Sequence, residues 1–361
     1  MAEPGRFLLE ASPDELGAWM VERGHRPYHA RQVFRWVFER RAVDFEGMTD
    51  VPQRLRVELE SAWSIFSTTI DMHRVAPDGT DKLLLVCRDG RRIECVLMAE
   101  EDRRTVCVSS QVGCGMGCVF CASGLKGVER NLTKGEIVEQ VVRLRNLLPP
   151  EERLTNLVVM GMGESLANLD NLIPALDWIC SPGGLGMGQR RVTISTVGLP
   201  EKMRKLAAMD RSYNLAVSLH APNEALRNEL VPINAKVGLQ AVVDAADEYF
   251  RRSGRRVTFE YVMLRGINDG LAEARALADL MDSRKAHANL IPYNPVPGLP
   301  YERPSAEAVR RFEGVLKARG LSVSVRKTKG REIDAACGQL RRRSEETGAG
   351  ARPDLLAGPG R

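Results

Sequence analysis

The chain has 361 residues, of which 43% are hydrophobic and 27% are charged, and its formal net charge at pH 7 is +5. These values suit a globular protein with one large domain and a smaller one, and the mild positive charge permits nucleic-acid binding without requiring it. Because the sequence has no run of about eighteen apolar residues and no apolar leader, we expect a cytoplasmic protein without a membrane span. The eight cysteines, several of them clustered, favour metal binding or catalysis over a secreted disulfide scaffold.

Residues 1–63 predict a small helical N-terminal domain. Apolar residues around Val33 and Val37 recur at helical spacing, and Pro52 begins a further helix. The same helices carry outward arginines such as Arg31, which could bind RNA phosphates in an accessory RNA-binding domain. A solvated protein surface would explain these charges equally well.

Residues 64–104 predict a small antiparallel β extension, because apolar and polar residues alternate on either side of turns at 77–79 and 89–90. Glu94 lies within one of these strands. A single glutamate on a strand is usually a surface residue, so the spacing alone gives Glu94 no role.

From residue 105 onward strand-like and helix-like segments alternate, which predicts a parallel sheet with helical crossovers. The expected strands are 105–108, 157–160, 192–195, 215–218, 257–263, 288–291 and 323–326. Thr133 and Glu136 form a capping box that begins the first crossover helix. Since the units are too few for an eight-stranded barrel, we predict an α/β fold with a partial (β/α)6 TIM-like barrel over 105–340. Residues 341–361, rich in glycine, proline and charge, are expected to be a disordered tail.

The segment Cys114-Gly-Met-Gly-Cys118-Val-Phe-Cys121 follows the first expected barrel strand. Structural zinc sites need four closed ligands, whereas three thiolates on a four-iron cluster would leave one iron open for a small molecule. The intervening glycines let the backbone wrap a bulky group. This spacing resembles that of the radical S-adenosylmethionine (SAM) superfamily, in which a 4Fe–4S cluster binds SAM. Three buried cysteines or a zinc loop are the alternatives.

Small polar clusters follow other expected strands, at the edge where parallel strands carry functional loops. Their members are Glu164, Ser165, Ser195, Ser218, Leu219, His220 and Asn294. Each cluster alone would more often be an ordinary loop, but several at equivalent positions favour a binding site. Glu164 could pair with the amino group of SAM. Cys337 follows a basic run near the end of the barrel, where a single late cysteine is usually a small buried hydrophobe.

Four stretches, 107–114, 130–136, 218–223 and 334–340, together resemble the RlmN/Cfr family of radical SAM RNA methyltransferases, and the resemblance extends over residues 26–340. RlmN members methylate C2 of an adenine in 23S rRNA and of an adenine in the tRNA anticodon loop, consuming two SAM through a methyl-cysteine intermediate. The resemblance implies this reaction, with Cfr-type methylation of C8 of the 23S rRNA adenine as the alternative.

The resemblance also implies roles for individual residues. The ligands of one 4Fe–4S cluster match Cys114, Cys118 and Cys121. The SAM-contact positions match Glu164, Ser165, Ser195, Ser218, Leu219, His220 and Asn294. The cysteine that carries the methyl group matches Cys337, the thiol that resolves the covalent RNA intermediate matches Cys107, and the proton acceptor matches Glu94. Two departures stand out. Ser165 replaces the more usual proline and would loosen its loop, and Cys95 puts an extra thiol next to Glu94.

The implied partners are 23S rRNA, tRNA, a cytosolic electron donor and a thiol reductant, and we expect a monomer. A radical route suits the target atom, because C2 of adenine is electrophilic and a poor nucleophile for ordinary methyl transfer. The target base must be single-stranded or flipped out to reach a site at the barrel rim. Candidate phosphate contacts, which would otherwise be solvated surface, are Arg190, Arg191, Arg255, Arg256, Arg326, Lys327, Lys329 and Arg331.

Overall fold

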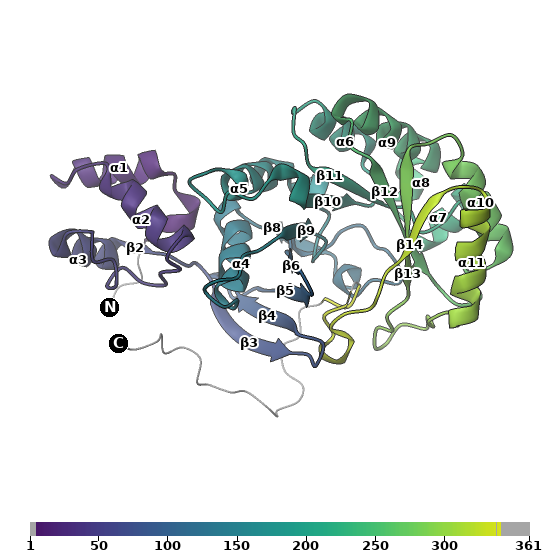
Figure 1. The fold of residues 1–361 in the computed structure, drawn as a ribbon, viewed down its shortest axis with the longest axis horizontal. Helices are drawn as coiled ribbons and strands as arrows, with labels where there is room; N and C mark the ends of the chain where they lie inside the picture. Colours follow the sequence, from purple (N-terminus) through teal and green to yellow (C-terminus); the bar gives the residue numbers. More distant parts are fainter. Residues whose placement is uncertain (1–4, 337, 341–361) are drawn as a thin grey trace.

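The computed structural model describes residues 5–336 and 338–340, and its main feature is a curved sheet flanked by helices (Figure 1). The sheet has ten strands in the order β14-β13-β12-β11-β10-β9-β6-β5-β4-β3. Its parallel part consists of β6 (Arg103–Cys107), β9 (Asn156–Val159), β10 (Val192–Thr196), β11 (Asn214–Ser218), β12 (Val257–Met263), β13 (Ala286–Pro292) and β14 (Ser322–Val325). These strands match the expected ones to within two residues at each end, and the α/β partial barrel is confirmed.

The antiparallel strands β3 (Thr69–Val75), β4 (Thr80–Val86) and β5 (Arg92–Glu100) continue the same sheet. The connection is made by β5, which pairs antiparallel with β6 and brings Val96 opposite Cys107. A separate hairpin, β7 (Gln111–Gly113) with β8 (Val128–Asn131), brackets the cysteine segment. The alternation pattern did not predict this hairpin, because strands this short contain too few residues to display a period.

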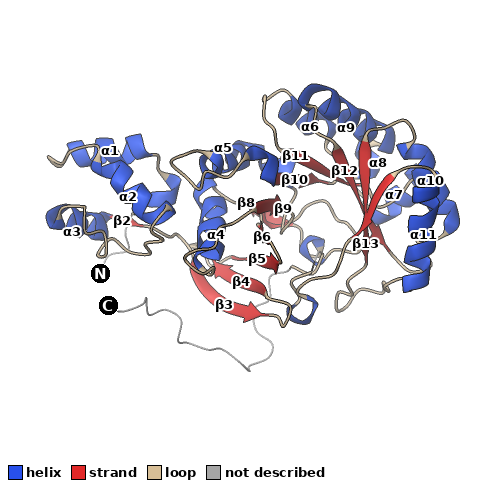
Figure 2. Ribbon diagram, viewed as in Figure 1, coloured by secondary structure: helices blue, strands red, loops and turns tan. Residues whose placement is uncertain are grey.

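Helices cover the outer face of the sheet, and the inner face forms the barrel lumen (Figure 2). They are α4 (Lys134–Asn146), α5 (Leu169–Cys180), α6 (Pro200–Ala207), α9 (Leu239–Ser253), α10 (Leu271–Met281) and α11 (Ala306–Ala318). Two short helices, α7 (Glu224–Leu230) and α8 (Asn234–Val237), follow β11, and α7 lies at the carboxyl edge of the strands. The predicted capping box is present at α4, where the Thr133 hydroxyl accepts from the Glu136 N–H and the Glu136 carboxylate accepts from the Thr133 N–H. Among the described helices, none combines the length and apolar character required to cross a bilayer.

The N-terminal unit contains α1 (Pro13–Val21), α2 (His29–Phe38) and α3 (Gln53–Ala62), as the helical periodicity predicted. It packs against α4 and α5 of the barrel. Trp178 of α5 makes edge contacts with Phe34 and Phe38, at ring-centroid distances of 5.4 and 5.8 Å. Buried Arg145 of α4 donates to the Phe38 carbonyl at 2.5 Å, so apolar and polar contacts both fix this unit to the barrel.

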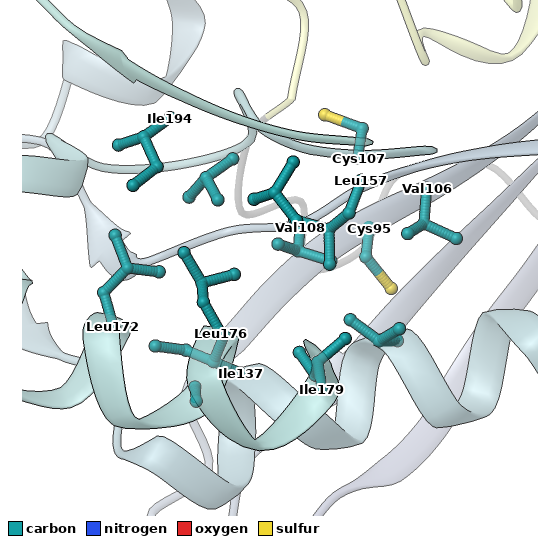
Figure 3. Packing of buried hydrophobic residues seen from close by; sticks show 14 of the residues in the cluster. Cys95, Val106, Cys107, Val108, Ile137, Leu157, Leu172, Leu176, Ile179 and Ile194 are labelled. Carbon is teal, nitrogen blue, oxygen red and sulfur yellow. The ribbon is translucent and has the colours of Figure 1, made fainter. Parts of the chain in front are cut away.

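The period-two alternation of strand side chains decides which residues reach the lumen. Val96 and Cys107 are cross-strand partners and therefore share a face of the sheet, and Glu94 lies on that face because it is two residues from Val96. Cys95 lies on the opposite face, and Figure 3 shows the sulfurs of Cys95 and Cys107 pointing to opposite sides of the sheet. Cys95 is completely buried in the apolar layer beneath the helices. The extra thiol next to Glu94 in sequence is thus separated from it by the sheet.

Candidate active site

The segment that carries the three cysteines emerges at the carboxyl edge of the parallel strands, after β6 and the short strand β7. Gly117 has a φ of 71°, a left-handed backbone that favours glycine. Backbone hydrogen bonds fix the segment, from the Val119 N–H to the Leu230 carbonyl at 3.2 Å and from the Ala122 N–H to the Gly338 carbonyl at 2.9 Å. The cysteine segment is therefore tied to α7 and to the C-terminal residues of the barrel.

Burial controls the ionisation of the cysteine thiols. It raises the pKa of Cys114 to about 12 and that of Cys118 well above its ordinary range. Thiolates are the form that binds metal, so these groups need a positively charged partner to lose their protons. In the described part of the chain, no group of three or more His, Cys, Asp or Glu side chains is placed to hold a single metal ion.

The three cysteines border one cavity together with most of the predicted SAM contacts. The predicted residues that line this cavity are Cys114, Cys118, Cys121, Glu164, Ser195, Ser218, His220 and Asn294. The wall also includes Phe120, Glu260, Tyr293 and Gly338. Ser165 and Leu219 are buried behind it rather than on its surface. Residues from seven separate loops and strands thus meet in the arrangement expected for the carboxyl edge of a barrel.

Glu164 connects two of the loops around the cavity. Its carboxylate accepts from the Val197 N–H at 2.8 Å and from the Leu166 N–H at 3.0 Å. Burial raises the pKa of this carboxyl, and the hydrogen bond from Val197 opposes the rise. Each carboxylate oxygen has more than one lone pair, so Glu164 can still accept a further hydrogen bond from a donor in the cavity.

The hydroxyls of Ser165 and Ser195 both donate to the Val159 carbonyl, at 3.1 and 2.6 Å. They join the end of β9 to β10 and to the short 3-10 helix that starts at Ser165. A proline at position 165 would have no hydroxyl to make this bond. The serine that departs from the family pattern therefore ties its loop down rather than loosening it.

His220 occupies a left-handed backbone position, with a φ of 62°. Its Nδ1 accepts from the Val262 N–H at 3.1 Å, so the proton of the neutral ring lies on Nε2. The ring meets Phe120 edge-on, at a centroid distance of 4.9 Å. Burial, with a smaller contribution from the charge of Arg227, lowers the pKa of His220 to about 3. The ring is thus a neutral donor at physiological pH.

The His220→Asn variant is expected to weaken the acid sensitivity of the fold. Because the pKa of His220 is about 3 in the folded protein and about 6.5 when free, the unfolded chain takes up a proton first as the pH falls below about 6.5. The contribution of neutral His220 to the free energy of unfolding is therefore complete above about pH 6.5 and falls as the pH drops towards 3. At pH 5 the loss reaches about 2 kcal/mol. Asparagine keeps an acceptor at the Nδ1 position and tolerates a positive φ. Urea unfolding of iron-free protein at pH 7 and pH 5 measures the difference, and equal losses in variant and wild type would contradict the assignment.

Arg227 of α7 is completely buried and lies behind the cavity wall. Its guanidinium donates to the carbonyls of Leu219 at 3.1 Å and Ser218 at 3.3 Å, and also to the Val197 carbonyl and the Asn234 side chain. All of these acceptors are neutral, and burial lowers the pKa of Arg227 to about 10. The negative charge of an ionised Cys118 acts in the opposite direction. Arg227 therefore holds the loops after β10 and β11 together and carries a positive charge close to the cysteine segment.

The residues after β14 return across the lumen and connect it to the antiparallel strands (Figure 1). Asn294 accepts from Thr328 at 3.2 Å, and the Gly330 N–H donates to Asp78 at 2.9 Å. Gln339 donates to the Pro295 carbonyl at 2.9 Å. Cys337 lies outside the described residues, as does the tail 341–361. Of the two neighbours of Cys337 in the chain, Ala336 lines a second cavity and Gly338 lines the cysteine cavity.

The second cavity is lined by the inner faces of β5, β6, β9, β10, β12, β13 and β14 and by the residues after β14, and it has a volume of about 860 Å³. Cys107 lines it, together with Arg326, Lys327 and Lys329 from the basic run. Glu260 and Asn294 line both cavities, so the two are contiguous. Burial raises the pKa of Glu260, and the charge of Arg326 opposes this.

Glu94 is buried on the lumen face of β5, where its carboxylate pairs with the ammonium of Lys82 at 2.8 Å.

Apart from the basic residues after β14, the candidate phosphate contacts lie elsewhere. Arg255 bonds Asn214 at 2.5 Å, and Arg256 bonds Ser322 at 3.2 Å, both at the amino ends of the strands and opposite the cysteines. Of the candidate phosphate contacts, only Arg326, Lys327 and Lys329, which follow β14, line the second cavity.

Sequence reasoning missed Lys82, Glu260 and Arg227. Glu260 could have been found, because a glutamate at an inward position of a buried parallel strand is unusual. Lys82 and Arg227 carry no local signal, since basic residues on a hairpin and on a short helix ordinarily face solvent.

Comparison with known proteins follows the division seen in the fold. Residues 7–65 match the family of ribosomal RNA large subunit methyltransferase N-terminal domains, and residues 108–278 match the radical SAM superfamily. The chain is 55% identical over 342 residues to a probable dual-specificity RNA methyltransferase RlmN of Rhodopirellula baltica, covering 95% of this chain and 92% of that protein. It is 43% identical over 346 residues to the dual-specificity RNA methyltransferase RlmN of Solidesulfovibrio magneticus, covering 95% and 98% of the two chains.

A solved structure agrees with these sequence matches. The crystal structure of a radical SAM methyltransferase from Sphaerobacter thermophilus superposes with a TM-score of 0.90 at 43% identity, covering 93% of this chain and 99% of that one. The similarity thus includes the N-terminal helices as well as the barrel. The chain belongs to the RlmN family of dual-specificity RNA methyltransferases within the radical SAM superfamily.

Proposed function

We propose that this protein methylates C2 of an adenine in 23S rRNA and of an adenine in the tRNA anticodon loop, through a methyl group carried on Cys337 and at the expense of two SAM. The names of the relatives support an RNA substrate and two classes of target. Activity in the cytosol is part of the proposal, because the RNAs, the electron donor and the thiol reductant are found there.

A single observation carries the proposal, namely two contiguous cavities with different chemistry. One is bordered by the three cysteines and by strand-end groups suited to SAM, and the other contains Cys107 and basic side chains. Ala336 lines the second cavity and Gly338 lines the first, and Cys337 stands between them in the sequence. A methyl-carrying thiol at this point would be within reach of both a radical source and an RNA base.

The residues of the first cavity fit a cluster and SAM. Thiols that surround a cavity instead of converging on one ion suit a multi-iron cluster, and Arg227 would balance part of its negative charge. When bound, a 4Fe–4S cluster would supply the electron that splits SAM into methionine and a 5′-deoxyadenosyl radical. Glu164 would accept from the amino group of SAM, and neutral His220 would offer its Nε2 proton as a donor.

Cys337 would act as a thiolate that takes the methyl group from a first SAM and displaces S-adenosylhomocysteine. Hydrogen abstraction from this methyl group leaves a methylene radical, which adds to C2 of the adenine. Glu94 would then accept the C2 proton as a general base. Cys107 would attack the sulfur of Cys337 as the sulfur–carbon bond to the RNA breaks, a proton would complete the new methyl group, and the unpaired electron would return to the centre that supplied it. A cytosolic thiol reductant would then reset the disulfide.

The second cavity is the proposed route for the target base. Its volume of about 860 Å³ suits a nucleotide that has left its stack. Arg326, Lys327 and Lys329 line it and would bind the flanking phosphates. The arginines of the N-terminal helices are further candidates for contact with the RNA outside the barrel.

Anaerobic reconstitution with iron and sulfide, followed by incubation with reductant, labelled SAM and fragments of 23S rRNA or tRNA, tests the proposal. Mass spectrometry of the digested RNA is expected to reveal 2-methyladenosine in both substrates. The 8-methyl isomer alone would replace the proposal with Cfr-type chemistry. Absence of 5′-deoxyadenosine would exclude radical catalysis altogether.

A further inference from the structure

Lys82 and Glu94 form a buried ion pair on the lumen face of the antiparallel strands. The β4–β5 register pairs Lys82 with Val96 and Leu84 with Glu94, so Lys82 and Glu94 lie diagonally on one face. The Nζ of Lys82 is 2.8 Å from Oε1 of Glu94, and only 7% and 6% of the two side chains are exposed. An ammonium ion this deeply buried is costly unless an anion pairs with it. The pair is therefore a specific feature rather than a surface contact.

The same ammonium makes a second contact, to the segment that leads to Cys337. Its Nζ donates to the backbone carbonyl of Asp334 at 3.2 Å, across 252 positions of sequence. Asp78, at the turn before β4, accepts from the Gly330 N–H at 2.9 Å and fixes the start of the same segment. Lys82 thus links the carboxylate of Glu94 to the backbone three residues before Cys337.

We propose that Lys82 is a positioning residue for the proton-transfer step, which keeps Glu94 ionised and fixes the distance between Glu94 and the segment that bears Cys337. This inference rests on the proposed function, in which Glu94 accepts the C2 proton. A carboxylate can accept a proton only when it is ionised, and in a buried site an ammonium at 2.8 Å favours the ionised form strongly. Lys82 itself would neither touch the RNA nor exchange its proton with it.

Other charged or titratable groups near the pair come from every neighbouring element. On the lumen face these are Arg74 of β3, Arg92 of β5, Cys107 of β6 and Asp334 of the C-terminal segment. On the opposite face, Cys95 of β5 and the α4 residues Arg143 and Glu139 interact electrostatically with one another across the helix layer. Lys82 forms an ion pair with Glu94 at 2.8 Å, so its removal should raise the proton affinity of that carboxylate.

Two substitutions separate the charge of Lys82 from its hydrogen bond. Lys82→Gln removes the charge and retains a donor for the Asp334 carbonyl, whereas Lys82→Arg retains the charge. Lys205→Met is the matched control, because Lys205 pairs with Asp170 on the exposed surface of α6. Steady-state methylation of an rRNA fragment is measured from pH 5.5 to 9 for the reconstituted enzymes, together with the iron content and the circular dichroism of each protein.

We expect the acid limb of the kcat profile of Lys82→Gln to move to higher pH by at least about one unit, because the carboxylate without its cation holds its proton longer. KM should change little, and Lys82→Arg, which keeps the charge, should have the acid limb of the wild type. A Lys82→Gln enzyme with the wild-type limb, or with a loss of kcat that is the same at every pH, would overturn the inference while leaving the proposed function intact. An inactive wild-type enzyme would overturn both. Should Lys82→Gln fail to fold, the acid limb of the kcat profile of Lys82→Arg becomes the deciding measurement. The inference requires it to coincide with that of the wild type.

Discussion

Replacing Cys118 by alanine is expected to abolish both cluster incorporation and SAM cleavage. Cys118 lies in the middle of the three-cysteine segment, and it borders the same cavity as Cys114 and Cys121. Loss of one ligand out of three leaves the remaining two unable to hold a four-iron cluster. Since loss of an outer-shell partner alone can cost about 10- to 100-fold in metal affinity, loss of a ligand should exceed about a hundredfold. Iron and sulfide content and 5′-deoxyadenosine release measure the two effects.

Cys180→Ala is the control for this experiment. Cys180 ends α5 on the outer layer of the barrel and does not line the cavity that the three cysteines border. This variant should bind iron and release 5′-deoxyadenosine like the wild type. Iron retention by Cys118→Ala, or uptake of one zinc ion by both proteins, would contradict the cluster assignment.

Cys337→Ala is expected to bind the cluster normally and yet to form no methylated RNA. The proposed reaction takes the methyl group from SAM onto this sulfur, and alanine has no nucleophile with which to receive it. Its neighbours Ala336 and Gly338 line the two cavities, so we expect the thiol of residue 337 to reach both reagents. Mass spectrometry of the intact enzyme should detect a protein-bound methyl group in the wild type and none in the variant.

Cys87→Ala separates this effect from a general loss of a thiol. Cys87 is buried, and burial raises its pKa to about 12, so we expect it to stay protonated and unreactive. Its replacement should leave methylation within about twofold of the wild type, as expected for a thiol with no chemical role. Methylated adenine produced by Cys337→Ala would mean that the methyl group reaches RNA by another path, and the methyl-cysteine mechanism would be abandoned.

The parallel strands and the cysteine loop could be predicted from the sequence because their signals are local. Strand periodicity, the Thr133–Glu136 capping box and the spacing of the cysteines each involve residues within one element or one turn. Parallel strands carry functional residues at their carboxyl ends, so residues far apart in the sequence could be predicted to lie at one edge of the sheet. His220 and Ser195 were found this way, since each directly follows or ends a strand.

The role of the antiparallel strands could not be read from local pattern. Glu94 has an ordinary strand neighbourhood in sequence, and its partner Lys82 is identified only by the β4–β5 register. The contact between Lys82 and Asp334 joins residues 252 positions apart. Even the side of the sheet that Cys95 occupies depends on the pairing of Val96 with Cys107, because a shift of one residue would exchange the two faces.

Arg227 has a consequence for how the cofactor would be acquired. One guanidinium holds the turns after β10 and β11 through their carbonyl oxygens, so protein groups alone provide these contacts. We therefore expect this part of the cavity wall to keep its shape in iron-free protein. Such preorganisation would lower the ordering entropy that insertion of a cluster must overcome.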